Sequence, residues 1–168
     1  TRDCNYQFCR LARCTRCDPE IHSSRAGARM TRVLTNSINL IDGLDLEDKE
    51  KGKYNKKLKD NFNSDYITEN IPGSQYVAYS VNKGEELSLC VREKNTEKFM
   101  DDNIILFVAI HELSHIMTPE NGHTPLFWDN MKYLLEQGAR MGIYKHVDYG
   151  KYPEMYCGME ITSTPMKV

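Results

Sequence analysis

Two histidines and a glutamate stand close together in the segment His111-Glu112-Leu113-Ser114-His115. Residues four positions apart fall on one face of a helix, so both imidazoles can be presented to a single metal ion. Glu112 projects beside them and is placed to accept a proton from a water molecule that the metal activates. On a helix, this H-E-x-x-H pattern is typical of zinc-dependent hydrolysis. The surrounding residues are apolar, where such polar groups are costly unless they are paired or ligated, which favours a metal site.

A catalytic zinc site needs a third protein ligand and one open position. His123 follows the motif after a short loop that can turn the chain back toward the first two imidazoles. Glu136 lies further along, on the next expected helix, and is the carboxylate alternative. We prefer His123, because the sequence Gly122-His123-Thr124-Pro125 is suited to fixing one imidazole at the start of a helix. His22 and His146 have no comparable context and are expected at the surface.

The motif, together with Gly122-His123-Thr124-Pro125-Leu126-Phe127-Trp128, resembles the signature of the WLM and SprT-like zinc metallopeptidases. Residues 82–86 and the segment Tyr156-Cys157-Gly158-Met159 are similar to the members of that group encoded by large DNA viruses. The resemblance covers about residues 75–160. The gap before His123 is longer than is usual in the WLM group.

This resemblance implies a small zincin-like α+β domain that hydrolyses proteins. It also implies a bound Zn²⁺ and Glu112 as the general base. The implied metal ligands are His111, His115 and His123. Members of the group act on proteins crosslinked to DNA, but no DNA-binding motif is evident in this sequence.

Hydrophobic periodicity predicts the helices that position these residues. Apolar residues at helical spacing predict a first helix over about 24–42. A second helix is capped by Asp101-Asp102-Asn103, carries the motif and stops at Thr118-Pro119. It is hydrophobic nearly all round and should lie buried at the centre of the domain. Thr124 caps a third helix over about 125–142.

The remaining segments predict strands and connections. Residues 75–82 and 85–93 show alternation around a glycine-containing turn, which predicts a β-hairpin. Residues 45–65 are highly charged, and Gly52 and several asparagines there favour a loose connection over a helix. The tail from Ile143 is expected to be extended chain held by tyrosine burial. The predicted fold is α+β, with an antiparallel or mixed sheet.

Composition limits the function classes. The chain has 168 residues, of which 40% are hydrophobic and 27% charged, an ordinary balance for one globular domain. The longest apolar run, Ile104–Ile110, is far shorter than the roughly 20 residues that span a bilayer. We therefore expect no transmembrane segment. Without a secretory hydrophobic region, an intracellular or virion-associated location is favoured over secretion. A net charge of −2 gives no global attraction to nucleic acid.

The first residues differ in composition from the rest. Residues 1–22 lack apolar periodicity and are predicted to be an arm, with residues 23–168 as a single metallopeptidase domain. Seven of the nine arginines lie within residues 1–32, which suggests either nucleic acid binding or a solvated basic face. A zinc knuckle, disulfides and free thiols remain alternatives for the arm cysteines. Those are Cys4, Cys9, Cys14 and Cys17; Cys90 and Cys157 are expected to be small core residues.

The leading functional hypothesis is a zinc-dependent endopeptidase that acts on a protein or peptide substrate. A tyrosine of the tail (Tyr149, Tyr152 or Tyr156) is a candidate for helping to stabilise the oxyanion. One alternative is a catalytically idle structural or virion interaction protein, with a viral assembly partner, that retains the fold. Another is a nucleic-acid-associated protease held by the basic arm. The intact Glu112 argues against a purely structural role, which needs no general base.

Overall fold

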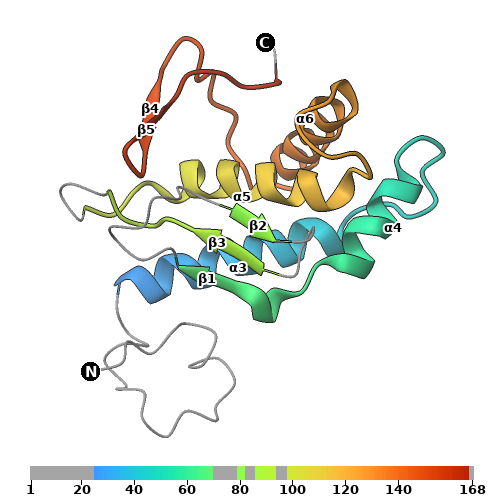
Figure 1. Ribbon diagram of the computed structural model, residues 1–168, viewed down its shortest axis with the longest axis horizontal. Coiled ribbons are helices and arrows are strands. Elements are labelled where there is room, and N and C mark those ends of the chain that lie inside the picture. Colours follow the sequence, from blue (N-terminus) through green and yellow to red (C-terminus); the bar gives the residue numbers. More distant parts are fainter. Residues whose placement is uncertain (1–24, 70–78, 82–85, 94–97, 167–168) are drawn as a thin grey trace, which may run out of the picture.

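The computed structural model describes residues 25–69, 79–81, 86–93 and 98–166, and the predicted arm lies outside them (Figure 1). These described residues form four α-helices, one short 3₁₀ turn (Ser64–Tyr66) and two small sheets. The fold is α+β, as predicted. None of the helices in this part of the chain combines the length and the apolar character needed to cross a bilayer.

Three helices appear where periodicity predicted them. They are α3 (Arg25–Asp42), α5 (Asp102–Met117) and α6 (Pro125–Arg140). The side chain of Asp101 accepts a hydrogen bond from the backbone of the first turn of α5, and Thr124 does the same for α6. These caps satisfy backbone donors that have no partner within the helix, so both helix starts are defined by local sequence.

The charged segment 45–65, predicted as a loose connection, contains the helix α4 (Gly52–Asn61). Leu58 is fully buried, and so is Asn55, whose amide donates to a backbone carbonyl of the preceding loop at 2.8 Å. A Cβ atom on Gly52 would lie 2.4 Å from a backbone oxygen of that loop. The prediction was wrong because this glycine reflects the close approach of two backbone segments rather than a break in the helix.

The predicted hairpin is confirmed within the described residues. Strand β2 (Tyr79–Val81) pairs antiparallel with β3 (Glu86–Leu89), while residues 75–78 and 82–85 lie outside the described part. A further strand, β1 (Ile67–Glu69), pairs parallel with β3, so the sheet is mixed, with the order β1-β3-β2. No strand was expected at β1, because three residues are too few to show alternation.

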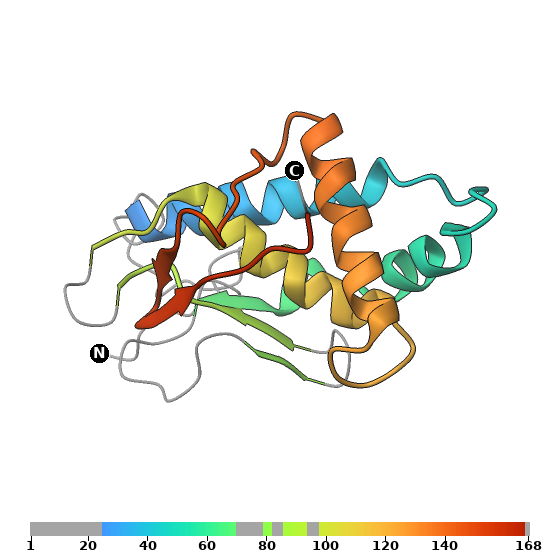
Figure 2. The same ribbon diagram turned by 90° about the horizontal axis from the view of Figure 1, so that it is seen from above.

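Helix α5 is the central element (Figure 1), and it contacts α3, α4, α6, β3 and β4. Residues 104–110 are all buried, which agrees with the prediction of a helix that is apolar on all sides. At its start, Asp102 accepts hydrogen bonds from Arg29 and Arg32 of α3. Burial opposes ionisation of this carboxyl group, but the arginines prevail and lower its pKa. In Figure 2 the start of α6 meets the end of α5.

The tail after α6 contains a second hairpin that the sequence analysis did not predict. Strands β4 (Glu154–Tyr156) and β5 (Met159–Ile161) pair antiparallel. The two residues between them, Cys157 and Gly158, both have positive φ angles, 51° and 81°. This is the conformation of a two-residue type I′ turn, which matches the twist of paired strands. The tail is held by tyrosine burial, as expected, at Tyr144, Tyr149 and Tyr156, whereas Tyr152 is exposed.

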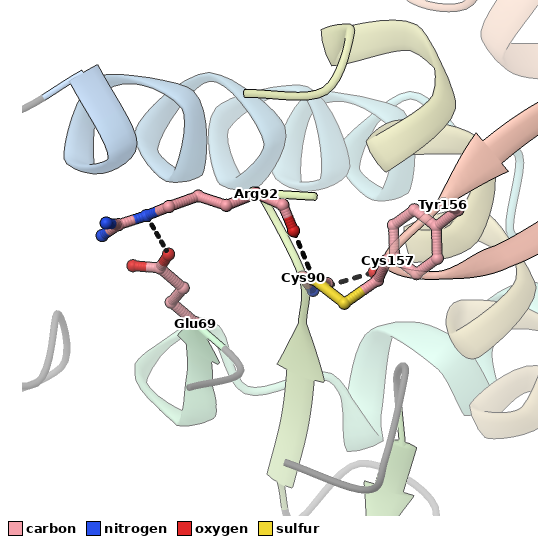
Figure 3. Close-up of a disulfide and its surroundings, with 5 residues drawn as sticks. All are labelled: Glu69, Cys90, Arg92, Tyr156 and Cys157. Carbon is pink, nitrogen blue, oxygen red and sulfur yellow. Dashed lines mark hydrogen bonds and ion pairs between the residues drawn. A yellow bond between two sulfur atoms is a disulfide. The ribbon is translucent and has the colours of Figure 1, made fainter. Parts of the chain in front are cut away.

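A disulfide joins the tail to the end of β3 (Figure 3). Cys90 and Cys157 are both buried, as predicted, but they are not separate core residues, because they form one covalent bridge. Beside it, the hydroxyl of Tyr156 accepts a hydrogen bond from the backbone N–H of Cys90 at 2.8 Å. The pairing escaped prediction because the two cysteines are 67 residues apart in sequence.

We predict that this disulfide contributes to stability. A bridge between residues 67 apart restricts the unfolded chain, and such bridges typically contribute about 2–4 kcal/mol. The melting temperature of the wild-type protein should fall on addition of a reductant. A Cys90→Ala/Cys157→Ala double variant should melt at the lower temperature with or without reductant. It retains the four cysteines of the arm, so it controls for their reduction. Equal melting of both proteins without reductant would contradict the prediction.

Candidate metal centre

The end of helix α5 carries both histidines of the H-E-x-x-H motif. His111 and His115 are one helical turn apart, with ring centroids separated by 5.0 Å, and both are half-buried. Glu112 follows His111 directly, and only 7% of its surface is exposed. The motif therefore lies on a helix that its neighbours hold on several sides, as a precisely positioned site requires.

The connection from α5 to α6 is fastened at its first residue. Thr118 is fully buried, and its Oγ1 accepts a hydrogen bond from Nδ2 of Asn130 at 3.0 Å. The other side of that amide, Oδ1, accepts a hydrogen bond from Lys51 at 2.9 Å. Asn130 thus links the end of α5, the body of α6 and the segment before α4, and this network limits where the loop can run.

The same loop brings a third imidazole to the first two. Gly122 has a φ of 79°, in the left-handed region that favours glycine. The next residue, His123, then turns toward α5, and its Nε2 lies 3.1 Å from Nε2 of His111. Its ring centroid is 4.9 Å from that of His115.

The three imidazoles fit a divalent metal ion. One nitrogen from each ring can be chosen so that all lie within 4.8 Å of one another. Tetrahedral zinc with Zn–N bonds of about 2.0–2.1 Å places its nitrogen ligands about 3.3 Å apart. The 3.1 Å between the Nε2 atoms of His111 and His123 is close to that spacing. The donor set, three neutral nitrogens with one open side, is the type found in catalytic zinc sites.

A single aromatic ring supports all three histidines. Phe127, on the first turn of α6, is fully buried. Its ring centroid lies 5.0 Å from that of His111, 4.4 Å from that of His115 and 4.8 Å from that of His123. A packed ring in contact with each imidazole restricts how far any of them can rotate. Phe127 is therefore a positioning residue of the site.

Burial sets the charge state of the site. Burial, together with the nearby His115 and His123, lowers the pKa of His111 to about 3, so this imidazole stays neutral, as a metal ligand must be. Burial alone raises the pKa of Glu112 to about 7. A general base works best when its pKa lies near the working pH.

Among the tail tyrosines, Tyr156 lies near this carboxyl group. Burial raises the pKa of Tyr156, and the charge of Glu112 adds to the shift. Tyr149 packs its ring against Phe107 at 4.8 Å, and Tyr152 is 62% exposed. Of the three tyrosines considered from the sequence, the structure therefore relates Tyr156 to the motif.

The sequence model of the WLM domain matches residues 58–156. The chain belongs to the WLM family. The matched residues include α5, α6 and the strands β1 to β4, so they contain every residue of the site described above.

The relatives of this WLM domain are proteins of large DNA viruses, as the resemblance predicted. An uncharacterized protein of Acanthamoeba polyphaga mimivirus is 32% identical over 144 residues, which cover 83% of this chain and 73% of that protein. An uncharacterized protein of Invertebrate iridescent virus 6 is 32% identical over 69 residues, 40% of this chain and 38% of that protein. A third, from Invertebrate iridescent virus 3, is 33% identical over 67 residues, 40% and 42% of the two chains. No solved structure matches the chain.

The structure of the WLM domain separates the candidates that the sequence left open. His111, His115 and His123 come together, whereas Glu136 is not in that group and lies 3.9 Å from the ammonium of Lys132. His146 is half-buried, with both ring nitrogens buried, so the expectation that it lies at the surface is wrong. His22 lies outside the described residues.

Sequence reasoning did not recognise the supporting residues of the WLM site. Asn130 was not singled out at all, and Phe127 was read as part of an apolar helix face and a family signature. The signal for Phe127 was present: an aromatic residue on the first turn of a helix directly after a candidate ligand must pack near that ligand. Nothing in the sequence marked Asn130, because its partners Thr118 and Lys51 come from different elements.

We predict that Gly122 is needed for the position of His123 rather than for folding. Gly122→Ala would force a φ of 79° on a residue with a Cβ, at a cost of about 1–2 kcal/mol. The loop can relieve that strain by moving His123. Affinity for added zinc should therefore fall, as measured by competition with a chromogenic chelator.

Gly142→Ala is the matched control for this prediction. Gly142 has a φ of 72°, and in both glycines an added Cβ would meet no heavy atom within 4 Å. The two variants should lose similar thermal stability, but Gly142→Ala should keep the wild-type zinc affinity. Equal zinc affinities in the two variants would show that the loop conformation does not position His123.

Proposed function

We propose that this WLM domain is a zinc-dependent endopeptidase. The observation that carries the proposal is the convergence of His111, His115 and His123 beside the buried carboxyl group of Glu112. A structural metal site has no use for a carboxyl group that is buried next to its ligands without belonging to them. A hydrolytic site needs one, because a water molecule must lose a proton when it attacks a carbonyl carbon.

The three imidazoles would hold the metal through one nitrogen each. When bound there, zinc supplies Lewis acidity, which polarises a carbonyl group and makes water acidic near pH 7. His123 is exposed, whereas the other two rings are half-buried, so the site is open on the His123 side. A polypeptide can approach the reacting atoms from that side.

Glu112 is the proposed general base. Its carboxylate accepts a proton from the attacking water and returns that proton to the amine of the leaving peptide. Burial prepares Glu112 for both steps, because a pKa near 7 leaves it able to hold and to release a proton at neutral pH. Desolvation also strengthens its interaction with charge that develops nearby.

Three variants test the proposed roles by their zinc content. Glu112→Gln keeps the shape of the side chain and should retain zinc, because Glu112 contacts water and not the metal. His123→Ala removes one of three ligands and should lose zinc during dialysis. Glu136→Gln should keep the wild-type zinc content, and it controls for substitution of an acidic residue. Zinc loss in Glu136→Gln together with retention in His123→Ala would show that the third ligand is a carboxylate.

Turnover distinguishes an enzyme from an idle fold. Zinc-loaded wild type should cleave an unfolded protein substrate, and the rate for Glu112→Gln should be about 100- to 10,000-fold lower. Chelation should abolish cleavage, and zinc should restore it. A protein that binds one zinc ion per chain but cleaves no unfolded protein would instead fit the structural or virion interaction role. Nucleic acid binding by the basic arm remains a prediction, and salt-dependent DNA binding that is lost on deletion of residues 1–32 would support it.

A further inference from the structure

A pocket of about 410 Å³ lies next to the metal centre, between the start of α6 and the C-terminal tail. From α6 it is lined by Pro125, Trp128, Asp129 and Lys132, which are spaced as one face of a helix. Residues 163–165 of the tail close its other side. Its volume is at the small end of the range of ligand sites, about 300–1,000 Å³. We call it the Trp128 pocket.

Trp128 belongs both to this pocket and to the surroundings of the metal centre. Its ring centroid lies 5.3 Å from that of His123 and 6.1 Å from that of His111. The indole is 40% exposed, although most large apolar side chains of the described residues are buried. An aromatic ring with one part packed and another part open to solvent is a common anchor for a binding partner. A group held in the pocket would therefore lie one ring away from the histidines.

The lining of the pocket favours an uncharged occupant. Asp129 forms an ion pair with Lys51, and the ammonium of Lys132 lies 3.9 Å from the carboxylate of Glu136. Both charges of the lining thus have a neighbour of opposite sign, and neither calls for a charged ligand. The apolar surfaces that remain are the indole and the proline rings at positions 125 and 165. Flat apolar surfaces of this kind suit an aromatic or bulky aliphatic side chain.

We propose that the Trp128 pocket is a specificity site that binds one large uncharged side chain of the polypeptide substrate, aromatic for preference, close to the bond that is cut. The substrate class follows from the proposed peptidase function, on which this inference rests. The pocket supplies selectivity by apolar burial, and the tail residues 163–165 form one of its walls.

The sole tryptophan of the chain is Trp128, so its fluorescence reports on the pocket directly. The probe is a set of end-blocked alanine hexapeptides with one central residue changed to Phe, Gly or Lys. They are titrated into zinc-loaded Glu112→Gln protein, which does not require turnover. The Phe peptide should shift the Trp128 emission and bind about tenfold or more tightly than the Gly peptide, because the apolar contact is lost without a side chain. Tighter binding of the Lys peptide, or no emission change with any peptide, would overturn the proposal.

Two variants on the tail separate the pocket from its surroundings. Ser163→Phe places a ring on the wall of the pocket and should reduce the Phe-over-Gly preference toward unity. Met155→Phe, an exposed position of the same tail outside the pocket lining, should leave that preference unchanged. These variants leave Trp128 and its contacts with the histidines intact, so zinc content should equal that of the wild type in both. An unchanged preference in Ser163→Phe would place the binding site elsewhere.

Cleavage of the same peptides distinguishes failure of this inference from failure of the proposed function. The wild-type protein should show a kcat/KM about tenfold or more higher for the Phe peptide than for the Gly peptide. Selective binding without cleavage of any peptide would leave the pocket standing and remove the peptidase function. Cleavage with equal kcat/KM and no emission change would leave the function standing and remove the pocket.

Discussion

The packing of the start of α6 against the end of α5 is the contact on which the site depends. Phe127 lies at this junction, in ring contact with His111, His115 and His123. Two of these histidines share a helix, so their separation follows from helix geometry. The third approaches from another segment, and it reaches them only because Asn130 fixes the loop at Thr118 and the aromatic ring fills the space below.

Burial gives the centre its chemical character. Helix α5 is surrounded by α3, α4, α6 and the strands β3 and β4, which hold it while they exclude water from most of its surface. The same exclusion keeps His111 neutral and raises the pKa of Glu112 toward neutrality. One physical cause therefore produces both a ligand in its metal-binding form and a carboxyl group suited to proton transfer.

The C-terminal tail connects the site to the rest of the fold in two places. At one place the Cys90–Cys157 bridge and the Tyr156 hydroxyl attach the β4–β5 hairpin to the end of β3, on the side where Tyr156 senses the charge of Glu112. At the other, residues 163–165 lie opposite Trp128 and complete a pocket that α6 alone could not form. A segment without long regular structure thus shapes the surroundings of the metal centre.

The sequence by itself determined the features that are encoded within a few neighbouring residues. The H-E-x-x-H spacing, the Asp101 and Thr124 caps and the all-round apolar character of α5 predicted the central helix and the residues on it, because helix geometry relates close neighbours directly. Only the tertiary structure decided the Cys90–Cys157 pairing, the parallel pairing of β1 with β3, and the helical state of residues 52–61. It likewise decided which side chains surround the metal centre. These features depend on contacts between segments distant in the chain, whose mutual approach is set by packing of the whole domain and leaves no local periodicity to read.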